Sequence, residues 1–135
     1  MADKLTDIEG IGPAFAAAFE KLGIHDTDGF LAAARTPAGR AKLAADLPAR
    51  PDLVLKWVNH ADLMRVKGIG GQYAELLEAA GVDTVKELRR RNAENLTARL
   101  AEVNAEKKLS GNTPALKQVT AWIEQAGTLD SVLEY

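Results

Sequence analysis

The apolar residues near the start of the chain are spaced as on one face of a helix. They step by three, one and three residues through Phe15, Ala18, Phe19 and Leu22, with polar or small residues between them. Gly23 follows the last of them, where a left-handed helix cap favours a residue without Cβ. The pattern therefore predicts a short amphipathic helix that ends at Gly23.

The same pattern returns 58 residues later. The segment Ile8–Pro13 (IEGIGP) recurs as Val66–Gly71 (VKGIGG), and the apolar face recurs as Tyr73, Leu76, Leu77 and Ala80, followed by Gly81. A fixed offset kept across twenty residues indicates an internal repeat. We therefore predict that the second segment forms the same turn and the same helix.

Each repeat also closes with a similar helix. Trp57 lies in the apolar series Val54, Trp57, Val58, Ala61, and Trp122 lies in the identically spaced series Val119, Trp122, Ile123, Ala126. Because both tryptophans lie on apolar helical stripes, we expect them to be buried in the core rather than stacked on bases.

Several polar residues have the spacing of helix starts. Thr84 followed by Glu87 fits a capping box, and Thr27 is the nearest equivalent in the first repeat, without the acidic partner. The pairs Thr36–Pro37 and Thr113–Pro114 each look like an N-cap residue followed by proline at the first helical position. All four positions are predicted helix starts.

No run of residues has the alternation of a strand, so the predicted fold class is all-α. We expect two pseudo-repeats of one helical unit, residues 1–62 and 63–135, completed by capping helices. A chain of 135 residues with 47% hydrophobic content is of ordinary size for one domain, which favours a single compact body.

The composition argues against several classes of protein. Cysteine is absent, and the two histidines are far apart in sequence, His25 in an expected loop and His60 on an expected helix surface. We therefore expect no metal and no other cofactor. The first residues do not resemble a signal peptide and no apolar run approaches eighteen residues, so we expect a cytoplasmic protein without a membrane partner.

Catalytic residues are not evident either. The only serines are Ser110 and Ser131, and neither has a histidine or lysine at a spacing that indicates a general base. The carboxylates are scattered over polar helix faces. We expect the protein not to be an enzyme.

The turn between the short helices resembles the helix-hairpin-helix motif, which has an apolar-Gly-apolar-Gly sequence. The whole chain is similar to a family of domains of unknown function with two such hairpins in tandem. The resemblance implies contact with a nucleic-acid backbone, in which glycines allow close approach and N–H groups at the next helix start face a phosphate. Such binding is independent of base sequence.

Neither turn has the basic residue that usually follows the second glycine of such hairpins, but charge distinguishes the two. Residues 1–34 hold two basic and six acidic side chains, whereas residues 63–91 hold six basic and four acidic ones. If DNA or RNA binds, we therefore expect it at the second hairpin. The candidate nucleic-acid-binding residues are Arg65, Lys67, Gly68, Ile69, Gly70, Gly71, Gln72, Arg89, Arg90 and Arg91.

Other interpretations remain open at this point. The glycine turns could serve only for helix packing, and the arginines at 89–91 could complement a helix dipole or lie on a solvated face. The main alternative function is protein-protein interaction, in which the acidic first repeat of one copy meets the basic second repeat of another. A third is an adaptor for a different protein.

Overall fold

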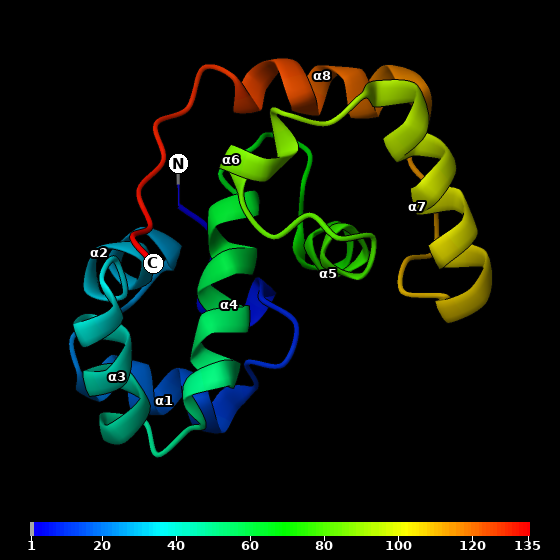
Figure 1. Cartoon of the computed structure of the whole chain (residues 1–135). Coiled ribbons are helices and arrows are strands. Elements are labelled where there is room, and N and C mark those ends of the chain that lie inside the picture. Colours follow the sequence, from blue (N-terminus) through cyan, green and yellow to red (C-terminus); the bar gives the residue numbers. More distant parts are fainter. Residues whose placement is uncertain (1) are drawn as a thin grey trace. The chain divides into compact units, whose positions relative to one another are not determined.

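The computed structural model describes residues 2–135, and in this range the protein is all-helical, as predicted (Figure 1). Apart from one isolated bridge between Lys4 and Asp26, no described residue pairs as a strand. In chain order the elements are the 3-10 helix η1 (Leu5–Asp7) and the α-helices α1 (Pro13–Lys21), α2 (Thr27–Ala33), α3 (Pro37–Asp46), α4 (Pro51–Leu63), α5 (Gly71–Ala79), α6 (Val85–Leu88), α7 (Ala93–Lys107) and α8 (Leu116–Ala126).

The contacts of the backbone divide the chain into two compact units. Unit 1 comprises the chain up to Asp62 together with the segment Val132–Tyr135, and unit 2 comprises Leu63–Ser131. Within the described residues, no helix is long and apolar enough to span a membrane.

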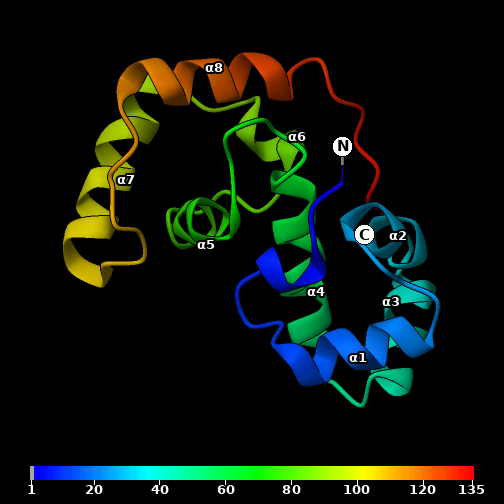
Figure 2. The same cartoon turned by 180° about the vertical axis from the view of Figure 1, so that it is seen from behind.

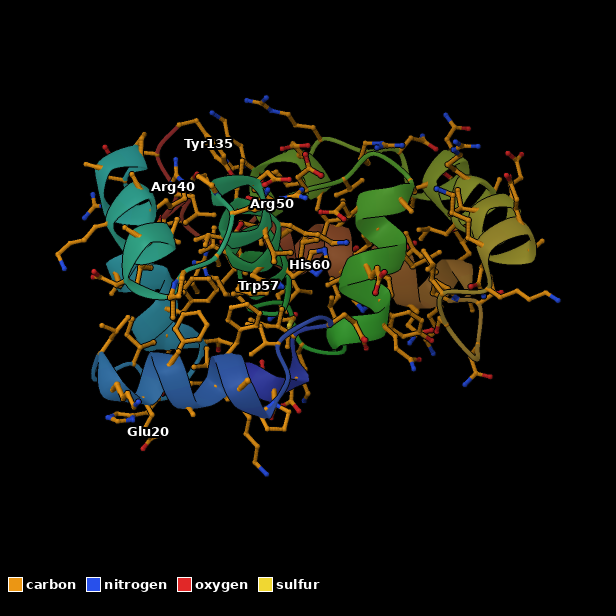
Figure 3. The ribbon with its side chains drawn as sticks, turned by 90° about the horizontal axis from the view of Figure 1, so that it is seen from below. Glu20, Arg40, Arg50, Trp57, His60 and Tyr135 are labelled. Carbon is orange, nitrogen blue, oxygen red and sulfur yellow. The ribbon has the colours of Figure 1, made fainter. Side chains whose placement is uncertain are left out.

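The core of unit 1 forms around α4. Val54, Trp57 and Val58 are buried along one face of this helix, which confirms the predicted burial of Trp57. Phe19 on α1 is also fully buried, with its ring edge-on to Phe30 at a centroid distance of 4.9 Å. Figure 3 shows Trp57 between α4 and α1. The aromatic rings therefore join three helices of this unit.

The core of unit 2 forms where α8 packs on α6 and α7, and α5 packs on α7 (Figure 2). Leu96 and Leu100 are fully buried on α7 because they lie four residues apart on one face. Trp122 on α8 is 2% exposed, so it too is buried as predicted.

Both helices after the repeated turns end in the same way. Gly23 follows α1 and Gly81 follows α5, with φ of 79° and 96°. The N–H of Ile24 donates to the carbonyl oxygen of Phe19, and the N–H of Val82 donates to that of Leu77. The left-handed glycines were predicted from the sequence, and together with these bonds they form Schellman motifs.

Two of the predicted helix starts are present. Thr36 is the N-cap of α3, and its hydroxyl accepts a hydrogen bond from the N–H of Gly39 at 3.1 Å. Thr84 is the N-cap of α6, but its hydroxyl donates to Glu87, whose second oxygen accepts from the N–H of Asp83. Glu87 therefore holds this helix start without the reciprocal bonds of a capping box.

At the other two predicted starts the N-cap residue is wrong, although α2 does begin at Thr27. Asp26 rather than Thr27 is the N-cap of α2, since its carboxylate accepts from the N–H of Gly29 at 2.8 Å. The helix α8 begins at Leu116, two residues after Pro114, with Ala115 as its N-cap. The hydroxyl of Thr113 is instead bonded by the side chain of Asn104, which keeps this residue in the preceding loop.

The prediction for His60 is also wrong. His60 is fully buried in α4, and its neighbours Asn59 and Asp62 are more than nine-tenths buried. The apolar stripe predicted a polar outer face for this helix, but the end of α4 is covered on that face as well. His25 does lie exposed in a loop, with Nδ1 3.4 Å from the carboxylate of Glu20.

Replacing Phe19 by alanine should destabilise unit 1 by about 3–5 kcal/mol, because it removes a fully buried ring and leaves a cavity beside Phe30 and Trp57. Urea denaturation followed by circular dichroism measures this change. Leu116→Ala, at a position 44% exposed, is the control and should change stability by no more than about 0.5 kcal/mol. Equal effects of the two variants would contradict this description of the core.

Candidate functional site

Two turns of the chain have the same backbone conformation. We call Ile8–Gly12 the Gly10 turn and Val66–Gly70 the Gly68 turn. Gly10 has φ of 96° and Gly68 has φ of 95°, in the left-handed region that favours glycine. In each turn the isoleucine between the two glycines, Ile11 or Ile69, donates its N–H to the carbonyl oxygen three residues before it, at 3.1 Å.

A tryptophan lies directly behind each of these glycines. A Cβ on Gly10 would lie 3.0 Å from Nε1 of Trp57, and a Cβ on Gly68 would lie 3.1 Å from Nε1 of Trp122. The rings of Phe15 and Tyr73 contact the same tryptophans, at centroid distances of 4.9 and 5.1 Å. Glycine is therefore required at both positions for two reasons: φ is in the left-handed region, and the indole leaves no room for a Cβ.

The second glycine of each turn has an open side. Gly12 and Gly70 are the N-caps of α1 and α5, with extended backbone at φ of −92° and −98°. A Cβ on either residue would have no atom within 4 Å. These two positions therefore face space that a ligand can enter.

A surface pocket of about 390 Å3 lies in front of the Gly68 turn. Its first wall is the turn and the start of α5, and its second wall is the loop between α7 and α8. The lining residues are Gly68, Gly70, Gly71, Gln72 and Tyr73 on the first wall and Ser110, Gly111 and Asn112 on the second.

Backbone N–H groups are available at this pocket. Gly71 and Gln72 are the first two residues of α5, so their N–H groups have no intrahelical acceptor. Among the described residues no other group accepts from them either. The helix dipole adds a partial positive charge at this end. In the Gly10 turn the corresponding first residue is Pro13, which has no N–H.

The second wall of the pocket is fixed by a buried asparagine. The side chain of Asn104, 8% exposed, donates to the carbonyl oxygen of Ser110 at 3.1 Å and accepts from its N–H at 3.0 Å. Lys108 ends α7 in the left-handed conformation, with φ of 53°. The sequence alone predicted no function for Ser110, Gly111 and Asn112.

Two basic residues flank Val66: Lys67 lies within the Gly68 turn and Arg65 lies just before it. Lys67 is exposed next to Gly68, and its backbone N–H donates to the side-chain oxygen of Gln125 at 2.9 Å. Arg65 is half-buried and donates through Nη1 to the carbonyl oxygen of Asp130 at 2.9 Å. Ile69 is buried, so it supports the turn from inside.

The structure does not bring the arginine run to the pocket. Arg91 lies beside Gly81, which follows the end of α5, whereas the pocket lies at its start. Nine helical residues separate these ends by about 13 Å. Arg89 donates to the carbonyl oxygen of Leu129 at 3.2 Å, and Arg90 is exposed.

The comparison with known families gives a clear assignment. Residues 9–129 match the family described as Domain of unknown function (DUF4332), and the chain belongs to it. No solved structure matches this chain. The matched range contains the Gly68 turn and all but the first residue of the Gly10 turn, and the family description gives no activity.

Alanine at the first glycine of each turn should be strongly destabilising. Gly10→Ala and Gly68→Ala each impose a left-handed conformation on a residue with Cβ, which costs about 1–3 kcal/mol, and each presses a methyl group on an indole. Gly12→Ala and Gly70→Ala are matched controls with open space and ordinary φ. Thermal unfolding should separate the two pairs, and equal melting temperatures would contradict the role of the tryptophans.

Proposed function

We propose that this protein is a non-catalytic binding module of the helix-hairpin-helix type that holds the phosphate backbone of a nucleic acid at the Gly68 turn. The observation that carries the proposal is the pocket at the start of α5. It combines glycine surfaces without Cβ and two N–H groups without acceptors among the described residues. A phosphate oxygen is the ligand that such groups bind best.

In this proposal the neighbouring lysines supply most of the charge. Lys67 is exposed next to the turn, and Lys108 is exposed two residues before Ser110 on the opposite wall. We expect the run Arg89–Arg91 to act only through its longer-range field, since it lies toward the other end of α5.

The Gly10 turn is the weaker candidate for two reasons. Pro13 removes one of the N–H groups that a phosphate would use. The exposed carboxylates of Asp7, just before this turn, and Glu9, within it, would also repel an anion. We therefore propose that the two repeats share a backbone but differ in function.

The expected binding is independent of base sequence and sensitive to salt. If Lys67 and Lys108 each neutralise one phosphate, the plot of log affinity against log salt for duplex DNA should have a slope of about −2. Unrelated duplexes should bind alike, because backbone N–H groups do not contact base edges. Fluorescence anisotropy with labelled duplexes at roughly 20–200 mM salt, a range that runs from weak to strong screening, measures both properties. Absence of binding at the lowest salt would contradict the proposal.

Gly70→Ala gives the sharpest test of the location. It adds one methyl group to the pocket without a close contact, so DNA affinity should fall by roughly tenfold, equal to about 1.4 kcal/mol, while stability falls no more than in Gly12→Ala, which also replaces an N-cap glycine. Gly12→Ala is the same change in the other turn and should leave affinity unchanged. Lys67→Gln should reduce the salt slope by about one. Equal losses from both glycine variants would contradict the location.

Two charge-reversal variants distinguish nucleic-acid binding from self-assembly. In an assembly of the acidic repeat with the basic repeat, Glu9→Lys and Lys67→Glu should each weaken self-association, and mixing the two variants should restore it. Sedimentation of each variant and of the mixture measures this. Restored association would favour a scaffold and overturn the nucleic-acid proposal.

A further inference from the structure

The segment Val132–Tyr135 lies on the helices of unit 1 in the manner of a bound peptide. Its backbone is held at Glu134, whose N–H donates to the carbonyl oxygen of Arg35 at 2.8 Å. The carbonyl oxygen of Glu134 accepts from Nη2 of Arg40 at 2.6 Å. Both backbone groups of one residue are therefore recognised by unit 1.

The side chains of the segment are recognised as well. Leu133 is buried, although no regular element surrounds it in sequence. The Glu134 carboxylate is 3.0 Å from Nε of Arg35, and the Tyr135 hydroxyl donates to the side-chain oxygen of Asn59 on α4. Each of three consecutive residues thus contacts unit 1 in a different way.

Arg40 on α3 is prepared for this contact. Its side chain is 8% exposed and donates through Nη1 to the carbonyl oxygens of Ala34 and Arg35, at 2.9 and 3.2 Å. These bonds fix the guanidinium so that Nη2 reaches Glu134 and Cζ lies over the Tyr135 ring, 5.2 Å from its centre (Figure 3). A buried charge held in this way needs an acceptor at Nη2.

We propose that unit 1 contains a binding site for an extended peptide of the pattern Leu-acidic-aromatic, and that Val132–Tyr135 is its resident ligand. The carbonyl of Arg35 and the guanidinium of Arg40 bind the peptide backbone. The surface that buries Leu133 selects the leucine, Arg35 selects the acidic residue, and Asn59 selects the aromatic residue through its hydroxyl. A partner segment with this pattern binds when the resident segment is released.

The strength of the site can be bounded. A tethered segment has an effective concentration in the millimolar range, so a segment that stays docked has an intrinsic Kd of about a millimolar or below. Binding of the free peptide can therefore be measured once substitutions prevent the resident segment from docking. The site lies in unit 1, so its test is independent of the proposed phosphate site.

The experiment uses the full chain with Leu133→Asp and Tyr135→Ala, which disable the resident segment. The probe is the end-blocked peptide Ser-Val-Leu-Glu-Tyr, titrated while amide NMR signals are followed. We expect saturable shifts at Arg35, Arg40 and Asn59, and a tenfold or larger loss for a control peptide with Asp in place of Leu. The unaltered chain should bind the peptide far more weakly, because its own segment competes.

A charge exchange provides the specificity test. A peptide with Lys in place of Glu should bind about two- to fivefold more weakly, the size expected for an exposed ion pair, and Arg35→Glu in the receptor should restore its affinity. If the double variant loses helical signal, Tyr135→Ala alone serves as receptor, since this ring is 69% exposed. Absence of shifts in a folded receptor, or equal binding of the Asp control peptide, would overturn the proposal.

Discussion

The structure depends on one contact made twice, a buried indole against the α-carbon of a left-handed glycine. Trp57 and Trp122 come from α4 and α8, far in sequence from the turns that they support, so the contact joins the first and last elements of each repeat. Nε1 of Trp57 has no acceptor among the described residues, and an unmet buried N–H costs about 1–3 kcal/mol. Burial of the ring, its edge contact with Phe15 and its tilted contact with Phe19 offset that cost.

The same backbone gives the two turns different surfaces. Proline at the first position of α1 removes an N–H, whereas Gly71 at the first position of α5 keeps it. The loop that Asn104 fixes then adds a second wall in front of the Gly68 turn. Shared packing and separate surface chemistry are compatible because the indole acts on the inner side of the turn, whereas the pocket lies on its outer side.

The sequence predicted those features that depend on local spacing. The left-handed glycines after α1 and α5 and the burial of the two tryptophans follow from residues within one or two turns of helix. Features that depend on distant contacts were missed. His60 is buried although it lies outside the apolar stripe of α4, where a surface position is expected. Ser110 is held at the pocket by its hydrogen bonds with Asn104. The segment Val132–Tyr135 has no periodic pattern in its sequence, and its docking depends on contacts with Arg40 in α3.

The central claim is that an anion binds at the start of α5 and not at the start of α1. The most direct measurement is the change in amide NMR signals of the unaltered chain on titration with a short duplex at low salt. The predicted result is large shifts at Gly71, Gln72 and Ser110, with small shifts at Ala14 and Phe15, which follow the Gly10 turn in sequence. Shifts confined to Arg89–Arg91, or equal shifts at both turns, would contradict the claim.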